Sequence, residues 1–177
     1  ADGRAAQRCF INVADVGIGG VVANEVNRGS KVLGGKLSFF IGSAKGLLKY
    51  SDKPMRYRFD GGEWQEESLT ALAVCNGRYF GGGMMVAPKA QMNDGLFDIT
   101  LWKGLGFVDF AIRSAKLYNG THVELAGTRT LRASLVEVEA MDGCEVLLDV
   151  DGEQPGRLPA RFRMLAGALR VKAPAAG

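Results

Sequence analysis

Short apolar runs separated by glycines dominate the pattern of hydrophobic and polar positions. Residues 8–14, 69–76 and 97–102 are predicted strands, the second of them buried. Residues 84–87 are predicted to form a short strand that ends at Pro88, because proline cannot donate to a ladder. Many short strands joined by glycine turns are typical of a sandwich or barrel.

Alternating apolar and charged residues predict further strands. Residues 55–59 alternate and lead into Asp60-Gly61-Gly62, so a hairpin is expected there. Residues 131–139 also alternate, with Val136 and Val138 directed inward. The remaining strands are expected after Val123, at residues 145–150, 160–165 and 168–171.

Helical spacing of apolar residues appears in three segments, at residues 19–27, 33–50 and 107–117. The 177 residues suffice for one hydrophobic core, so we expect a single domain over residues 1–177. The predicted fold class is therefore mainly β, a β-sandwich with a few short helices. The chain begins at Ala1 without an initiator methionine, which we interpret as a fragment of a longer protein.

Composition narrows the functional classes. Hydrophobic residues make up 47% and charged residues 23%, which is usual for a globular protein. No basic stripe with interleaved aromatic residues accompanies the net charge of +3, so a nucleic-acid partner is not expected. Neither a membrane-spanning run nor a signal peptide is expected. The three widely spaced cysteines indicate free thiols in a reducing cytoplasm.

The strongest candidate for chemistry is an acidic turn in the last third of the chain. Asp149, Asp151 and Glu153 lie close together, with Gly152 turning the chain and Glu153 projecting from the turn. Carboxylates this close raise one another's pKa, which favours a general base near neutral pH. From the residues alone, a solvated acidic turn is an equally good interpretation.

Two loops are weaker candidates. The glycine-rich loop at residues 76–88 contains Arg78, which could meet an anionic group, but a plain connection between strands explains its glycines more simply. The turn Asn93-Asp94-Gly95 could hold Mg²⁺ through one carboxylate and two carbonyls, but a turn without metal is the safer interpretation. Residues 17–20 lack the full GxGxxG fingerprint and predict a tight strand-to-helix turn.

In series, these segments resemble the C-terminal domain of the diacylglycerol kinase catalytic family, close to the bacterial YegS-like and DgkB-like lipid kinases. The resemblance covers nearly the whole chain, and its pieces follow the family order. They are Phe-Ile-Asn-Val-Ala at 10–14 with Gly-Ile-Gly-Gly at 17–20, Leu-Gly-Gly-Lys-Leu-Ser-Phe at 33–39, Asn-Gly-Arg-Tyr-Phe-Gly-Gly-Gly-Met at 76–84, Ala-Pro-Lys-Ala at 87–90, Asn-Asp-Gly-Leu at 93–96, Asp-Gly-Glu at 151–153 and Gly-Ala-Leu-Arg-Val at 167–171.

The resemblance implies the roles of particular residues. The family's proton acceptor falls on Glu153, with Asp151 beside it as the second catalytic residue. The family's structural Mg²⁺ site falls on the Asp94 carboxylate and the backbone carbonyls of Gln91 and Leu96. In addition, Arg78 would face the cleft between the two domains of such kinases and contribute to substrate binding.

The resemblance further implies the substrate-side half of a two-domain, ATP-dependent lipid kinase that phosphorylates a diacylglycerol-like hydroxyl. ATP would bind mainly to an N-terminal domain carrying a Gly-Gly-Asp-Gly-Thr loop. That loop does not occur in this chain, so the chain alone is expected to be inactive. A cytoplasmic location with peripheral membrane contact is implied, and formation of a homodimer is left open.

Two alternatives compete with this interpretation. Within the same superfamily, the acceptor would be a sphingoid base or NAD instead of a diacylglycerol-like lipid. In a different class, the chain would be a non-catalytic module that binds lipid or regulates another protein. The sequence does not fix which acceptor is phosphorylated.

Overall fold

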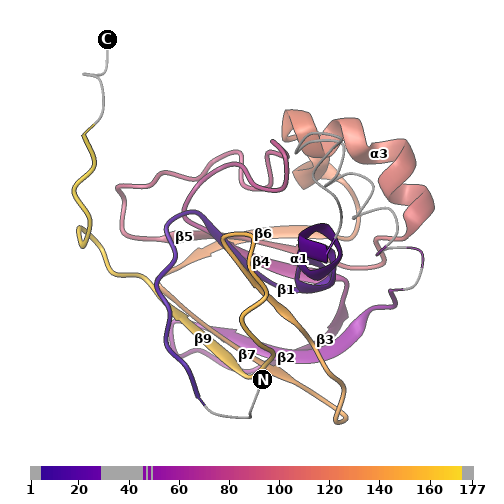
Figure 1. Ribbon diagram of the computed structural model, residues 1–177, viewed down its shortest axis with the longest axis horizontal. Coiled ribbons are helices and arrows are strands. Elements are labelled where there is room, and N and C mark those ends of the chain that lie inside the picture. The colour runs from indigo at the N-terminus through magenta and orange to yellow at the C-terminus, as the bar shows by residue number, and fades with distance from the viewer. Residues whose placement is uncertain (1–4, 29–45, 47, 49, 173–177) are drawn as a thin grey trace.

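The computed structural model describes residues 5–28, 46, 48 and 50–172. Two antiparallel sheets stack face to face, and helices cover the outer face of the larger sheet (Figure 1). The mainly β sandwich with a few short helices that the sequence predicts is therefore confirmed.

The larger sheet, sheet A, has the strand order β6-β5-β4-β1-β8. Its strands are β1 (Val13–Gly17), β4 (Ala71–Cys75), β5 (Phe97–Trp102), β6 (Thr128–Ala133) and β8 (Leu148–Val150). Every residue of β1 and β4 is buried, because sheet B covers one face of these strands and the helices cover the other. This explains why residues 69–76 form an unbroken apolar run instead of an alternating one.

The smaller sheet, sheet B, has the order β3-β2-β7-β9. Its strands are β2 (Lys53–Phe59), β3 (Gln65–Leu69), β7 (Leu135–Ala140) and β9 (Ala160–Arg163). The predicted hairpin joins β2 to β3, and Asp60 and Gly61 turn it with φ angles of 50° and 74°. Val136 and Val138 are fully buried, as the alternation of their segment predicts.

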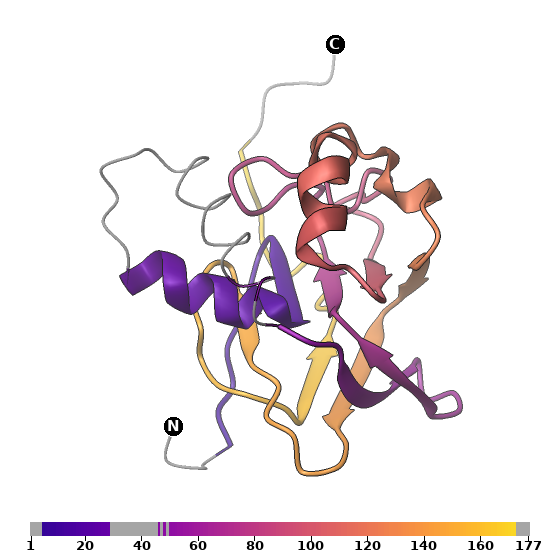
Figure 2. The same ribbon diagram turned by 90° about the vertical axis from the view of Figure 1, so that its right-hand side faces the viewer.

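The helices pack on the face of sheet A that is turned away from sheet B (Figure 2). They are α1 (Ile18–Arg28), α3 (Phe107–Asn119) and the short 3₁₀ helix η2 (Thr121–Glu124). Ile18 and Val22 of α1 and Phe110 and Leu117 of α3 belong to one buried apolar cluster with the outward-facing residues of β4. Within the described ranges, no helix is long and apolar enough to cross a bilayer.

Several strand predictions are wrong. Residues 84–87 form no strand, because the glycines before them fold back and leave only an isolated bridge between Phe80 and Met84. Residues 168–171 follow the last strand and pair with nothing in the described part of the chain. Residues 131–139 divide into two strands that belong to different sheets.

The division of residues 131–139 has a local cause at Ser134. The backbone N–H groups of Ser134 and Leu135 both donate to Asp60 Oδ1 at 2.9 Å, so the chain crosses from sheet A to sheet B there. Val123 also departs from the predicted strands and lies in η2. Almost all of the helix predicted at 33–50 lies outside the described residues.

One end of sheet A collects the loops that the sequence singles out. The strands are antiparallel, and their registers pair Val13 with Cys75, Cys75 with Asp98 and Ala14 with Val150. The start of β1, the end of β4, the start of β5 and the end of β8 therefore share one end of the sheet. We call this the hairpin end of sheet A, because it carries the turn at residues 151–153.

Candidate active site

The acidic turn is a tight hairpin immediately after β8. Val150 N–H donates to the Glu153 carbonyl at 2.8 Å, and Glu153 N–H donates to the Val150 carbonyl at 3.1 Å. Asp151 and Gly152 make the turn with φ angles of 51° and 88°. Left-handed backbone is rare for a residue with a Cβ, so interactions outside the turn must hold Asp151 in place.

The carboxylate of Asp151 supplies that anchor. It accepts three consecutive backbone N–H groups, from Ile11 at 2.8 Å, Asn12 at 3.1 Å and Val13 at 3.0 Å. In return, Asp151 N–H donates to the Val13 carbonyl at 2.9 Å. The turn is thus fixed to the chain that leads into β1, and the Asp151 oxygens are engaged with backbone.

Glu153 differs from Asp151 because its side chain is 71% exposed. Its Oε2 lies 2.8 Å from Nη1 of Arg8, whose side chain is 56% exposed. An exposed ion pair of this kind contributes little stability, so the two side chains separate readily. Glu153 is therefore a carboxylate on a rigid backbone that can accept a proton from an incoming hydroxyl group.

Asp149 behaves unlike the other two acids of the turn because it is buried. Its Oδ1 accepts Gly152 N–H at 2.8 Å, and its side chain lies on the helix side of sheet A opposite Asp15 of β1. Burial raises the pKa of Asp149 to about 6, the Gly152 N–H lowers it in part, and the charge of Asp151 raises it again. Asp149 thus has the raised pKa that the sequence suggested for closely spaced carboxylates.

Asp15 is the second buried acid, and sequence reasoning missed it. Burial raises the pKa of Asp15 well above its usual value, and the neighbouring charge of Asp149 raises it further. Asp15 Oδ1 has no hydrogen-bond partner among the described residues. A Cβ at Gly19 would lie only 2.0 Å from Asp15 Oδ2, so the start of α1 rests directly on this carboxyl group.

The glycine-rich loop begins at the same end of sheet A. Asn76 N–H and Gly77 N–H both donate to the Asn12 carbonyl, at 2.9 and 3.0 Å. Arg78 Nε donates to the Ala90 carbonyl at 2.9 Å, which ties the loop to the turn that precedes β5. The side chain of Arg78 is exposed, and its proposed contact with substrate stays a prediction.

Asp94 lies in the turn before β5, close to a second acid and an arginine. Asp94 Oδ1 accepts Leu96 N–H at 3.0 Å, and its Oδ2 contacts Arg132 of β6. Arg132 Nε also lies 3.5 Å from Asp98 Oδ2, which is buried and makes no hydrogen bond within the described residues. Burial raises the pKa of Asp98, Arg132 lowers it, and Asp94 raises it again.

The residues at this turn suit a hard cation in their donor types. Carboxylate and carbonyl oxygens are the ligands that Mg²⁺ takes, and Asp98 adds a second carboxylate whose Oδ2 pairs with Arg132 only at 3.5 Å. Arg132 supplies the positive charge beside Asp94 in this structure, so a metal ion would compete with it. The described side chains contain no group of three or more metal-ligating residues, so backbone carbonyls would have to complete the set.

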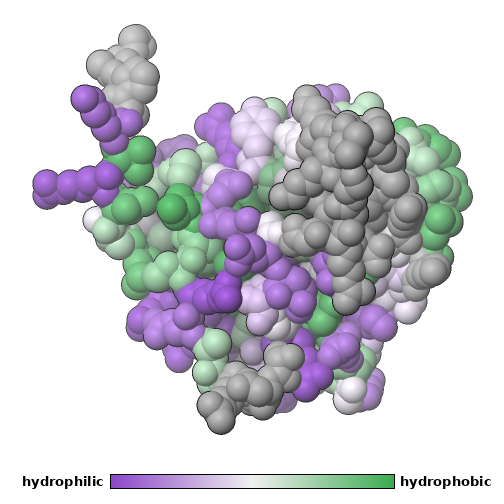
Figure 3. All heavy atoms as spheres, viewed as in Figure 1, coloured by the Kyte–Doolittle hydropathy of each residue, from purple (hydrophilic) through white to green (hydrophobic). Residues whose placement is uncertain are grey.

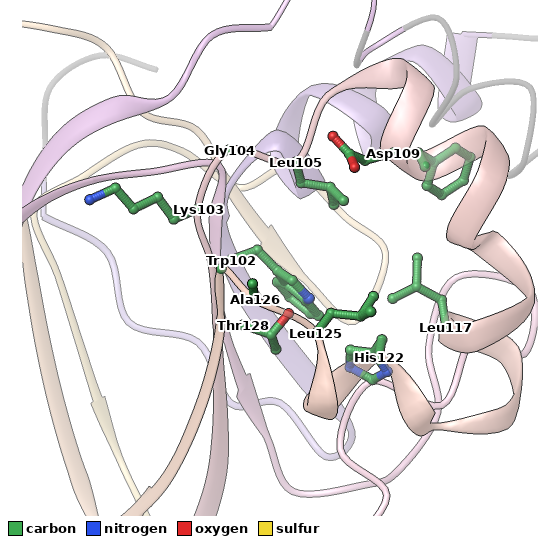
Figure 4. Close-up of a pocket in the computed structure, with 12 residues that line it drawn as sticks. Trp102, Lys103, Gly104, Leu105, Asp109, Leu117, His122, Leu125, Ala126 and Thr128 are labelled. Carbon is green, nitrogen blue, oxygen red and sulfur yellow. The ribbon is translucent and has the colours of Figure 1, made fainter.

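A pocket on the helix side of sheet A lies away from the hairpin end. It lies among α3, η2 and the residues after β5, with Leu105, Leu117 and Leu125 among its lining (Figure 4). His122 is buried there and stacks on Trp102 with ring centroids 5.8 Å apart. Burial lowers the pKa of His122, offset in part by nearby carbonyls, so the ring is neutral and structural at neutral pH.

The hairpin end of sheet A therefore unites most of the predicted site. Residues 8–13 lie between the turn at 151–153 and the loop at 76–79. Besides the bonds to Asp151, Asn12 Nδ2 donates to the Tyr79 carbonyl at 2.8 Å and Asn76 Nδ2 donates to the Ile11 carbonyl at 2.7 Å. Phe10 extends this contact to β5, because it stacks on Phe97 with ring centroids 5.5 Å apart. The structure adds four charged residues that no short-range sequence motif indicated, namely Arg8, Asp15, Asp98 and Arg132.

Comparisons with known proteins agree with this architecture. The family model described as YegS C-terminal NAD kinase beta sandwich-like domain matches residues 12–173. A diacylglycerol kinase of Mycobacterium tuberculosis (strain CDC 1551 / Oshkosh) is 31% identical over 176 residues, which is 99% of this chain and 56% of that protein. A Pseudomonas aeruginosa (strain UCBPP-PA14) protein named "Probable lipid kinase YegS-like" is 34% identical over 171 residues, 95% of this chain and 54% of its own length.

A solved structure shows the same fold. The crystal structure of a diacylglycerol kinase from Bacillus anthracis str. Sterne superposes with a TM-score of 0.56 at 19% identity. The alignment covers 89% of this chain and 47% of that one. At this identity the match concerns the fold alone.

The two stacked antiparallel sheets define a β-sandwich, in agreement with the description of the matching family model. The chain belongs to the family of YegS C-terminal NAD kinase β-sandwich-like domains. It spans about half the length of the curated relatives it matches.

Proposed function

We propose that this chain is the substrate-side domain of an ATP-dependent kinase that phosphorylates the hydroxyl group of a diacylglycerol-like lipid. The single observation that carries the proposal is the exposed Glu153 carboxylate on a turn that Asp151 fixes to β1. The family membership and the names of the relatives support a lipid as the acceptor.

In this proposal the acceptor hydroxyl oxygen attacks the γ-phosphorus of ATP. The bond from that phosphorus to the β–γ bridging oxygen breaks, ADP leaves, and the hydroxyl proton passes to Glu153. Asp151 keeps the turn in position and does not take the proton, because backbone N–H groups occupy both of its oxygens. ATP would be held mainly by residues outside this chain, and Arg78 is proposed to face the substrate.

Mg²⁺ is the proposed metal, held by the Asp94 carboxylate and the carbonyls of Gln91 and Leu96. When bound, the ion would neutralise the acidic turn before β5 and fix its conformation. Asp98 supports the proposal because it adds a second carboxylate beside Asp94, paired with Arg132 only at 3.5 Å. Arg132 would then give up its contact with Asp94 and keep its ion pair with Asp98.

Peripheral membrane contact is proposed for α3. Hydrophobic side chains gather over this helix at the right-hand edge of the molecule in Figure 3, where Val108 is 64% and Ile112 is 76% exposed. Lys116 lies one turn beyond Ile112, and the exposed side chains described on α3 include no acid. An exposed apolar helix face with a basic residue suits the surface of a bilayer that contains anionic lipid, and Asp109, in the first turn of α3, is half-buried.

The replacement Glu153→Gln in the full-length protein tests the assigned base. We expect kcat for a diacylglycerol acceptor to fall by about 10²- to 10⁴-fold, because the amide cannot accept the proton. The melting temperature should hardly change, since the side chain is exposed and its ion pair is weak. The measurement is transfer of labelled phosphate from ATP to extracted lipid.

Glu145→Gln is a matched control for this replacement. Glu145 forms an equally exposed pair with Arg157 at 2.7 Å, away from the turn, so its loss should leave turnover unchanged. If Glu153→Gln turned over at the wild-type rate, the role of Glu153 would be excluded.

The alternatives give different results in the same assay. Labelled phosphate on NAD or on a sphingoid base would change the acceptor and leave the role of Glu153 intact. Binding of diacylglycerol without any transfer would favour a non-catalytic module.

A further inference from the structure

We propose that Asp149 is a positioning residue, whose buried carboxylate, set against Asp15, holds the Gly152 turn and so directs Glu153 toward the acceptor. This inference rests on the proposed role of Glu153 as the base. It assigns a purpose to two buried acids that the proposed chemistry does not use.

The link from Asp149 to the base is short and direct. Asp149 Oδ1 accepts Gly152 N–H at 2.8 Å, and Gly152 is the residue before Glu153. Gly152 has a φ of 88°, and this hydrogen bond holds the peptide unit between Asp151 and Gly152, next to the residue that carries the base. Asp151 fixes the turn from outside, through β1, whereas Asp149 fixes it from within the sheet.

The position of Asp149 is set by its neighbour across the ladder. The register pairs Asp15 of β1 with Asp149 of β8, and both side chains are at least 97% buried. Two buried carboxylates on adjacent strands cannot both ionise without a large penalty, so the pair retains one proton. A backbone N–H favours the charged form of each acid, that of Gly152 at Asp149 and that of Gly19 at Asp15, but Asp15 Oδ1 has no partner among the described residues, so the proton belongs on Asp15.

The titratable groups described around this pair are acids, a phenol and a thiol. Tyr50 and Cys75 face Asp15, Asp52 faces Tyr50, and Asp151 faces Asp149. Within the described part of the chain, no lysine, arginine or histidine forms an ion pair or a hydrogen bond with either acid. Loss of the shared proton would therefore force two carboxylates apart and pull on the turn that carries Glu153.

The main test replaces Asp149 by Ala in the full-length protein. We expect kcat for the lipid acceptor to fall by about ten- to a hundredfold with KM for ATP unchanged, because the base is misdirected but present. Amide hydrogen exchange at residues 151–153 should speed up. Asp149→Asn should restore most of the rate, since the amide oxygen can still accept Gly152 N–H.

The matched control is Asp60→Ala. Asp60 likewise accepts backbone N–H groups at 2.9 Å, but it holds the crossing from β6 to β7, and β6 lies at the opposite edge of sheet A from β8. Its loss should leave kcat unchanged even if the melting temperature falls.

A pH profile gives a second readout that depends on the pair and not on folding alone. Wild-type kcat should fall at high pH, where the shared proton is lost, and Asp15→Asn should flatten that fall because its amide stays neutral. If Asp149→Ala failed to fold, an unchanged profile in Asp15→Asn would by itself overturn the proposal.

Glu153→Gln assayed in parallel distinguishes failure of the positioning role of Asp149 from failure of the proposed base. An inactive Glu153→Gln with a fully active Asp149→Ala overturns the positioning role alone. A fully active Glu153→Gln overturns the base, and with it the positioning role.

Discussion

At the scale of single residues, the pair of buried acids has a consequence for stability. An unfolded Asp loses its proton near pH 4, whereas burial and mutual repulsion keep Asp15 protonated to higher pH in the folded chain. The folded state therefore binds more protons, and the stability contributed by the pair falls as pH rises above about 4. The pKa of Asp149 is raised to about 6, so its contribution to stability likewise falls as the pH rises from about 4 to 6.

We accordingly expect Asp15→Asn to stabilise the domain at neutral pH, by on the order of 1–3 kcal/mol. The gain over the wild type should be larger at pH 8 than at pH 5, as measured by urea denaturation at both values. Asp142→Asn, at an exposed turn, is the control and should change little. A gain that shrank with rising pH would contradict the protonated state assigned to Asp15.

For these residues, the sequence predicted the acidic turn but not the burial of Asp149 against Asp15. The spacing of Asp149, Asp151 and Glu153 indicated an acidic turn, and Glu153 does project from it. That Asp149 is buried depends on its register with Asp15, which lies 134 positions earlier in the chain and has no local signal. A carboxyl group within an apolar run was the only available hint, and alternation alone does not say which partner it meets.

At the scale of elements, prediction succeeded wherever one segment decides its own structure. The hairpin at residues 60–62 and the helices at 18–28 and 107–119 follow from turn chemistry and from periodicity. The break at Ser134 could not be predicted, because it depends on the carboxylate of Asp60 far away in sequence. An alternating pattern fixes the face of a residue but not the sheet to which its strand belongs.

The exposed apolar face of α3 gives an element-scale prediction. Combined Val108→Glu and Ile112→Glu replacements should reduce binding of the full-length protein to vesicles of phosphatidylcholine and phosphatidylglycerol by about tenfold or more. Two apolar contacts would be lost and two negative charges added at an anionic surface. Vesicle co-sedimentation measures the change.

Leu169→Glu is the control for this prediction. Leu169 is 61% exposed but lies outside α3, so its replacement should not affect sedimentation with vesicles. If the α3 variant instead converted a dimer into a monomer and kept its vesicle binding, α3 would be a contact between two copies of the chain.

At the scale of the whole molecule, a bound metal should raise the stability of the entire fold by mass action. Mg²⁺ at a hundred times its Kd would add about 2.7 kcal/mol, which raises the melting temperature by several degrees. Asp94→Asn should abolish the Mg²⁺-dependent rise, whereas Asp142→Asn should keep it. A rise that persisted in Asp94→Asn would place the ion elsewhere.

The central place of β1 also bears on the order in which the molecule is assembled. Its five residues lie near the start of the chain, yet they pair with β4 and with β8, whose partners lie up to residue 150. Contacts this distant in sequence form late and slowly, because the entropy of closing a long loop is lost before the contacts contribute any stability. During synthesis β1 can pair with β4 once residue 75 has emerged from the ribosome, whereas its pairing with β8 must wait for residue 150. The turn that holds Glu153 can therefore be completed only as the last part of sheet A closes.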